Sequence, residues 1–185
     1  MSLYSMQIPE GFRGTATTIN LMRALACSGA KSDAVHRLAA LIVQGLPRRD
    51  YEAEAAALLA WVQRNCRYVR DPWTPDGTER VQHPEVTLFE TKSGDCDDLT
   101  VAYCALAGSI GFPYAFRTVG IDPRRPTEFS HVYALLEVDG KWRPVDPMFT
   151  TSYVGWEPPR RTAEDDRAGV PVSDSKIGTS MDWRA

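Results

Sequence analysis

The sequence predicts an α+β fold in which N-terminal helices pack on an antiparallel sheet of three or more strands. Two observations predict this class. Apolar residues recur at helical spacing through the first 65 residues, whereas segments after residue 113 read as strands. Between two of these strands lies Asp139-Gly140, a strong signal for a two-residue hairpin turn. Helices followed by strands in this order are typical of an α+β layer arrangement.

Composition limits the function classes. The 185 residues are 43% apolar, enough for one domain with a proper core, and the net charge of −3 predicts no broad basic face for nucleic acid. No 18-residue apolar run or export signal is present, so we expect no membrane partner and a cytoplasmic protein. The four cysteines show no pairing pattern and are expected to be reduced. The three histidines are widely scattered, so we expect no metal and no cofactor.

The predicted organisation is an irregular segment over 1–14, a single domain over 15–156 and a polar tail over 157–185. Within the domain, the first predicted helix runs over 15–28, the second from a Ser32 cap to Gln44, and the third from an Asp50 cap to about Asn65. The residues expected to face inward from the first helix are Ile19, Met22, Leu25 and Ala26.

A long connection over 72–93 follows, because Pro72 favours an extended chain before it and few periodic signals come after it. Loops of this length are often functional, and this one leads straight to Cys96. Trp73 and His83 are therefore candidate cleft-wall residues; an anchored loop that only packs on the core is an equal alternative.

Cys96 is predicted to lie in the first turn of a helix. Asp95 is a suitable N-cap, Gly94 lets the chain turn before it, and Gly111 is a fitting stop. A thiol there meets unpaired N–H groups and the positive end of the helix dipole, both of which favour thiolate. The neighbouring aspartates oppose that effect, so the cysteine still needs a base.

His131 and Asp146 are predicted to meet across the hairpin. If Asp139 and Gly140 form the loop, Val138 pairs with Lys141, and Tyr133 faces Asp146 further along. Side chains alternate between faces, so His131 and Asp146 project from one face as diagonal neighbours, and a one-residue slip would separate them.

A cysteine at a helix start, a histidine on a strand and an aspartate on the next strand have the logic of a Cys-His-Asp triad. Three motifs here resemble those of the transglutaminase-like (papain-like) cysteine enzyme superfamily, with matching order and spacing. They are Gly-Asp-Cys-Asp-Asp over 94–98, Ser-His-Val-Tyr-Ala over 130–134 and Val-Asp-Pro over 145–147. The segment over 61–71 also resembles the family's lead-in, and the likeness covers roughly 50–150.

The resemblance implies a papain-like or transglutaminase-core fold with the nucleophile at the start of a central helix. It implies that Cys96 is the nucleophile, His131 the base and Asp146 the orienting group. It also implies an oxyanion donor upstream of the cysteine, which the sequence does not locate. Residues 17–23 are loosely similar to phage-encoded members.

The leading hypothesis is a bacterial or phage-type cysteine peptidase or amidase acting on a protein or peptide substrate. Two alternatives stay open. A lysine amine could intercept the acyl-enzyme and give protein cross-linking, although no calcium loop is present. The fold could also serve as a non-catalytic binding or assembly module.

Overall fold

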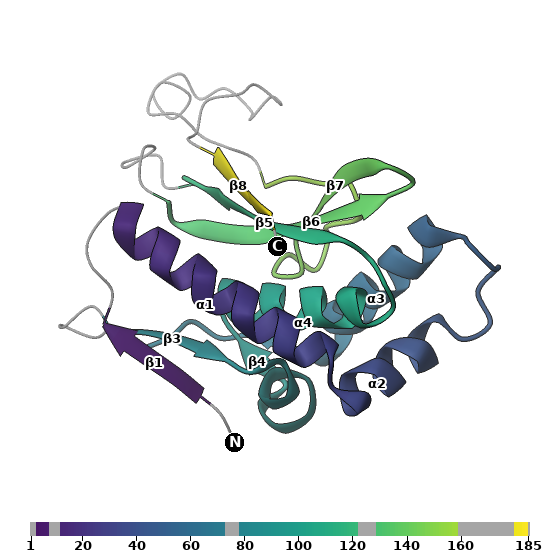
Figure 1. The fold of residues 1–185 in the computed structure, drawn as a ribbon, viewed down its shortest axis with the longest axis horizontal. Helices are drawn as coiled ribbons and strands as arrows, with labels where there is room; N and C mark the ends of the chain where they lie inside the picture. The colour runs from purple at the N-terminus through teal and green to yellow at the C-terminus, as the bar shows by residue number, and fades with distance from the viewer. Residues whose placement is uncertain (1–2, 8–11, 73–77, 122–128, 159–179, 185) are drawn as a thin grey trace.

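A computed structural model describes residues 3–7, 12–72, 78–121, 129–158 and 180–184. Its main feature is a layer of helices beneath a four-stranded antiparallel sheet of order β7-β6-β5-β8 (Figure 1). This confirms the predicted α+β class. The helices are α1 (Phe12–Ala30), α2 (Asp33–Val43), α3 (Tyr51–Asn65), α4 (Cys96–Ser109) and a π-helical segment, η1 (Val86–Thr91). The strands are β1 (Leu3–Gln7), β2 (Arg67–Tyr68), β3 (Thr78–Gln82), β4 (Ser93–Gly94), β5 (Tyr114–Val119), β6 (His131–Val138), β7 (Lys141–Val145) and β8 (Ser180–Arg184).

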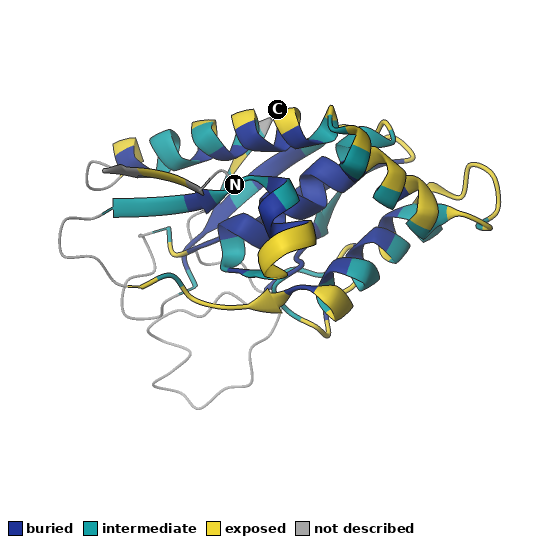
Figure 2. Ribbon diagram, turned by 90° about the horizontal axis from the view of Figure 1, so that it is seen from below, coloured by how far each residue is buried: buried dark blue, intermediate teal, exposed yellow. Residues whose placement is uncertain are grey.

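The central helix is α4. Every residue from Asp97 to Ala107 is buried, because α1, α2 and α3 pack around α4 and β6 packs against it. The three outer helices bury one side and expose the other (Figure 2). The inward face predicted for α1 is confirmed: Ile19, Met22, Leu25 and Ala26 are all buried.

The predicted starts of α2 and α3 are also confirmed, whereas α1 begins at Phe12, three residues before its predicted start. Ser32 caps α2 through its hydroxyl, and the Asp50 carboxylate accepts a hydrogen bond from the Ala53 amide at the start of α3. Gly29, which follows the predicted end of the first helix at residue 28, lies inside α1 instead. A Cβ on Gly29 would come within 2.5 Å of Pro84 Cγ and 3.0 Å of Ala105 Cβ, so glycine is required there for close packing.

The hairpin register is confirmed residue by residue. Val138 pairs with Lys141 and Ala134 pairs with Val145, as a two-residue loop requires. Asp139 and Gly140 have φ values of +50° and +72°, the left-handed backbone of a type I′ turn.

Two predicted irregular regions contain regular structure. In the segment over 1–14, β1 pairs with β3, and α1 begins at Phe12. In the connection over 72–93, β3 and η1 are followed by β4, which pairs in parallel with β2. These strands are short and their partners lie far away in sequence, so no local pattern revealed them.

The prediction of a polar tail over 157–185 is corrected in part. Residues 180–184 form β8, which pairs antiparallel with β5 and extends the sheet by one strand. Trp183 anchors β8: its indole N–H donates to Thr118 Oγ1 at 3.2 Å, and its ring stacks on Phe12. Residues 149–156 form turns without a strand. No helix in the described part of the chain has the length and apolar character needed to cross a membrane.

Candidate active site

Cys96 is the first residue of α4, as predicted. Asp95 is the N-cap, and a capping box joins it to Asp98: the Asp95 carboxylate accepts from the Asp97 amide at 3.2 Å, and the Asp98 carboxylate accepts from the Asp95 amide at 3.3 Å. The flanking aspartates thus close the helix end, while Cys96 keeps part of its surface open to solvent.

Gly94 has a different role from the predicted one. Its φ is not positive, so no sharp left-handed turn requires glycine there. A Cβ at this position would lie 2.3 Å from Asp98 Cβ and 2.5 Å from Asp98 Oδ2. Glycine therefore lets the capping carboxylate of Asp98 approach the backbone before Cys96.

The strand β6 meets α4 at Val132, the residue after His131. Extending the β6–β7 register would place Pro147 opposite Val132, and proline has no N–H to donate. The Val132 carbonyl instead accepts from Thr100 Oγ1 at 3.3 Å, and the Val132 amide hydrogen-bonds to the Cys96 sulfur. The end of β7 thus frees backbone groups that hold the start of α4.

His131 and Asp146 form a buried pair. The imidazole Nε2 lies 2.6 Å from Asp146 Oδ2, and the two side chains are 1% and 0% exposed. Asp146 Oδ1 accepts from the Met148 amide at 3.0 Å, so both carboxylate oxygens have partners. The diagonal contact predicted from the hairpin register is therefore present.

Burial and nearby charges determine the direction in which the pKa of the Cys96 thiol shifts. Burial raises its pKa well above the ordinary value, and the carboxylates of Asp97, Asp95 and Asp146 raise it further. The hydrogen bond from the Val132 amide acts in the opposite direction. The helix N-terminus thus does not suffice to make a thiolate, and the thiol needs a proton acceptor.

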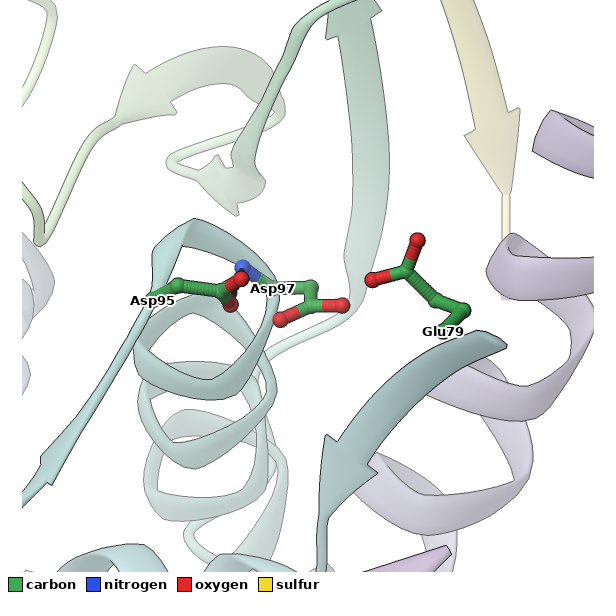
Figure 3. A group of neighbouring side chains, drawn as sticks. All are labelled: Glu79, Asp95 and Asp97. Carbon is green, nitrogen blue, oxygen red and sulfur yellow. Dashed lines mark hydrogen bonds between the residues drawn. The ribbon is translucent and has the colours of Figure 1, made fainter. Parts of the chain in front are cut away.

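Three acidic side chains gather at the start of α4: Glu79, Asp95 and Asp97 (Figure 3). One ligand oxygen from each lies within 4.8 Å of the others. Burial and then the neighbouring carboxylates raise the pKa of Asp97 well above its usual range and raise that of Glu79. Oxygens this close could share a hard cation, and they can equally share protons.

A fourth acidic residue of this region, Asp98, is hydrogen-bonded to Gln82. The backbone amide of Gln82 donates to Asp98 Oδ1 and its side-chain amide to Asp98 Oδ2, each at 2.7 Å. Burial nevertheless raises the pKa of Asp98 to about 7. The sequence did not indicate Gln82, because β3 is positioned by contacts with distant elements, namely β1, α1 and α4.

Of the two residues predicted to line the cleft wall, His83 lies away from Cys96. His83 Nε2 contacts Ser28 Oγ at the end of α1, at 3.3 Å, and the next residue, Pro84, packs against Gly29 and Ala105. Ala105 is nine residues along α4 from Cys96, about 13 Å of helix, so His83 is not beside the thiol. Trp73 lies outside the described residues.

All four cysteines are described and are free thiols, as expected. Cys27 is exposed, whereas Cys66 and Cys104 are buried. Burial raises the pKa of Cys66 to about 11 and raises that of Cys104 still further.

Two further side chains near the site, Tyr68 and Phe149, were not predicted from the sequence. Tyr68 stands opposite Gly94 in the β2–β4 pair, and burial followed by the charges of Cys96 and Asp95 raises its pKa. Phe149 presents its ring to the His131 imidazole in an edge-on contact, with centroids 5.8 Å apart. No local sequence signal distinguishes either residue from an ordinary aromatic.

When the chain is compared with known proteins, one family model matches it. The model of the Transglutaminase-like superfamily matches residues 37–147, which include all three motifs. No curated protein matches the chain significantly.

Two solved structures share the fold. One is a proposed cysteine protease from Cytophaga hutchinsonii, with a TM-score of 0.52 and 16% identity over 79% of this chain and 49% of that chain. The other is a proposed protease from Parabacteroides distasonis, with a TM-score of 0.52 and 12% identity over 74% of this chain and 27% of that chain. The chain spans less than half the length of either structure.

Proposed function

This chain belongs to the transglutaminase-like superfamily, and from that premise we propose that it is a cysteine-dependent acyl-transfer enzyme that hydrolyses a peptide or isopeptide bond. The observation that carries the proposal is the buried His131–Asp146 pair, which lies where β6 meets the first turn of the Cys96 helix. A half-exposed surface histidine with an unrelated aspartate would not be enclosed in this way.

In the proposed reaction, Asp146 fixes the tautomer of His131. Its Oδ2 accepts the Nε2 proton across 2.6 Å, which leaves Nδ1 with a free lone pair. Nδ1 removes the proton from the Cys96 thiol, and the thiolate then attacks the substrate carbonyl carbon. Base assistance is required because burial and the acidic neighbours hold the thiol in its protonated form.

The tetrahedral intermediate carries its charge on the former carbonyl oxygen. In this proposal the donor to that oxygen is the Cys96 backbone N–H, and its location at the positive end of α4 supports this role. The His131 imidazolium passes its proton to the leaving amine as the C–N bond breaks. Water, deprotonated by His131, then attacks the thioester and regenerates the thiol.

The pH dependence of Cys96 alkylation by iodoacetamide tests this assignment. We would use a Cys27→Ser background, because Cys27 is exposed, whereas Cys96 is partly exposed and the other two cysteines are buried. If the pair forms, Cys96 should label rapidly at about pH 6, where an ordinary thiol with a pKa of about 8.5 reacts slowly. We expect His131→Ala to slow this labelling roughly tenfold or more, since no other group then takes the thiol proton.

Intact mass spectrometry would report the labelled fraction, and Asp146→Ala would be measured beside His131→Ala. Labelling that rises only with the titration of an ordinary thiol, unchanged by either substitution, would overturn catalysis and favour the binding-module alternative. If the labelling does depend on His131, peptide substrates incubated with and without an added primary amine would separate hydrolysis from cross-linking.

A further inference from the structure

The turn segment over 147–158, here called the arm, covers the His131–Asp146 pair. Phe149 lies edge-on against the imidazole, and Trp156 packs on Phe149 with ring centroids 5.1 Å apart. The arm is attached near its far end, where the Gly155 amide donates to the Pro144 carbonyl at 2.7 Å. The burial of the pair therefore depends on where the arm lies.

One side chain of α3 holds the middle of the arm. The Gln63 amide nitrogen lies 2.8 Å from the Phe149 carbonyl, 2.9 Å from Ser152 Oγ and 3.2 Å from the Ser152 carbonyl. Three acceptors converge on a group with two hydrogens, so at least one hydrogen is shared. Gln63 is only partly buried and uses its nitrogen entirely on the arm.

A hydrogen-bond chain continues from Gln63 to the candidate site. Ser152 Oγ accepts a hydrogen bond from Gln63 and donates one to the Asp146 carbonyl at 2.5 Å. The hydroxyl is therefore engaged both as acceptor and as donor. Asp146 is thus held at its backbone by Ser152 and at its carboxylate by the Met148 amide, and both partners belong to the arm.

We propose that Gln63 is a positioning residue of the site: by holding the arm, it fixes Asp146 against His131 and keeps Phe149 over the imidazole. The proposal rests on the proposed function insofar as the pair serves Cys96. An apolar residue at position 63 could pack there, but it would leave the Phe149 and Ser152 acceptors without their donor. The arm would then relax, and the pair at its base would lose its alignment and its cover.

Two substitutions of Gln63 separate packing from hydrogen bonding. Gln63→Met keeps a side chain of similar length without a donor, and Gln63→Glu keeps the shape but offers only acceptors to three acceptors. The matched control is Asn65→Ala on the same helix, because the Asn65 amide donates to Trp61 of α3 and not to the arm.

Two readouts are measured in the Cys27→Ser background: the downfield proton resonance of the hydrogen-bonded His131 imidazole, assigned with His131→Ala, and the rate of Cys96 alkylation at about pH 6. We expect Gln63→Met to broaden or remove the resonance and to slow the alkylation roughly tenfold, with circular dichroism unchanged. Gln63→Glu should have the larger effect, and Asn65→Ala should match the parent in both readouts.

An unaltered His131 resonance in folded Gln63→Met and Gln63→Glu would overturn the proposal. If the Gln63 variants do not fold, Ser152→Ala decides, because it removes the link to Asp146 while the Phe149 carbonyl keeps its bond to Gln63. An unaltered resonance in Ser152→Ala would then overturn the proposal, and a lost one would support it. Failure of the proposed function looks different: the parent would show the resonance but no His131-dependent alkylation at low pH.

Discussion

Asp97, the residue after Cys96, is the most unusual single residue of the site. It is buried, and it lies beside Asp95 and Glu79 (Figure 3). Burial and these carboxylates raise its pKa well above its usual range. Asp97 therefore holds a proton in the folded protein under conditions in which it is ionised in the unfolded chain.

This proton makes stability depend on pH in a defined direction. Because the pKa of Asp97 is raised on folding, its contribution to stability is complete below about pH 4 and is lost as the pH rises through its folded-state pKa. Asn mimics the protonated acid at every pH. We therefore expect Asp97→Asn to be more stable than the parent by roughly 1 kcal/mol at about pH 8, and equal to it at about pH 4.

Urea unfolding at a series of pH values would measure this difference. Asp33→Asn serves as the control, because Asp33 is exposed in the first turn of α2. Parallel stability curves for the parent and Asp97→Asn over the whole pH range would contradict the buried proton.

Among the elements, the junction between β4 and α4 is the most tightly constrained. Ala at position 94 would force its Cβ into Asp98 Cβ, at 2.3 Å, so the backbone or the capping box must move. We expect Gly94→Ala to lower the free energy of unfolding by roughly 1–3 kcal/mol and to slow Cys96 alkylation at low pH, because the helix start is displaced.

The matched control for this junction is Gly45→Ala. Gly45 has a φ of +88° and open space around it, so the substitution there adds backbone strain without a clash. It should cost roughly 1 kcal/mol and leave Cys96 reactivity unchanged. Equal unfolding costs and equal reactivity for the two variants would show that Asp98 does not require glycine at position 94.

Sequence reasoning worked best for elements whose signals are local. The caps Ser32, Asp50 and Asp95 each act within a few residues, and the helices after them begin as expected. The Asp139-Gly140 turn sets the β6–β7 register, and this register brings Asp146 to His131. Gln63 carried no such signal, because its partners lie 86 and 89 residues away.

For the whole molecule, β8 forms one edge of the four-stranded sheet and covers β5. Arg117 joins β5 to β8 through paired hydrogen bonds to the Asp182 carboxylate, at 2.6 and 3.0 Å, and Trp183 reaches Thr118 and Phe12. Deletion of residues 180–185 should lower stability on the order of 3 kcal/mol. It should also promote concentration-dependent association, since the edge of β5 would be unpaired.

Thermal unfolding and sedimentation at several concentrations would test the role of β8. Asp182→Asn isolates the exposed ion pair and should change stability by less than about 1 kcal/mol. A deletion variant that stays monomeric with the parent's melting temperature would show that β8 adds little to the sheet.

The sequence by itself determined the starts of α2, α3 and α4, the hairpin register and the resulting contact of His131 with Asp146, because caps and turns act over a few residues. Only the tertiary structure decided the pairing of β1 with β3, of β2 with β4 and of β8 with β5, since each strand is stabilised by a distant partner. It also decided the electrostatics of the site. Asp97 became a buried acid, and Gln63 a holder of the arm, only when β3, α3 and the arm came together around α4 and β6.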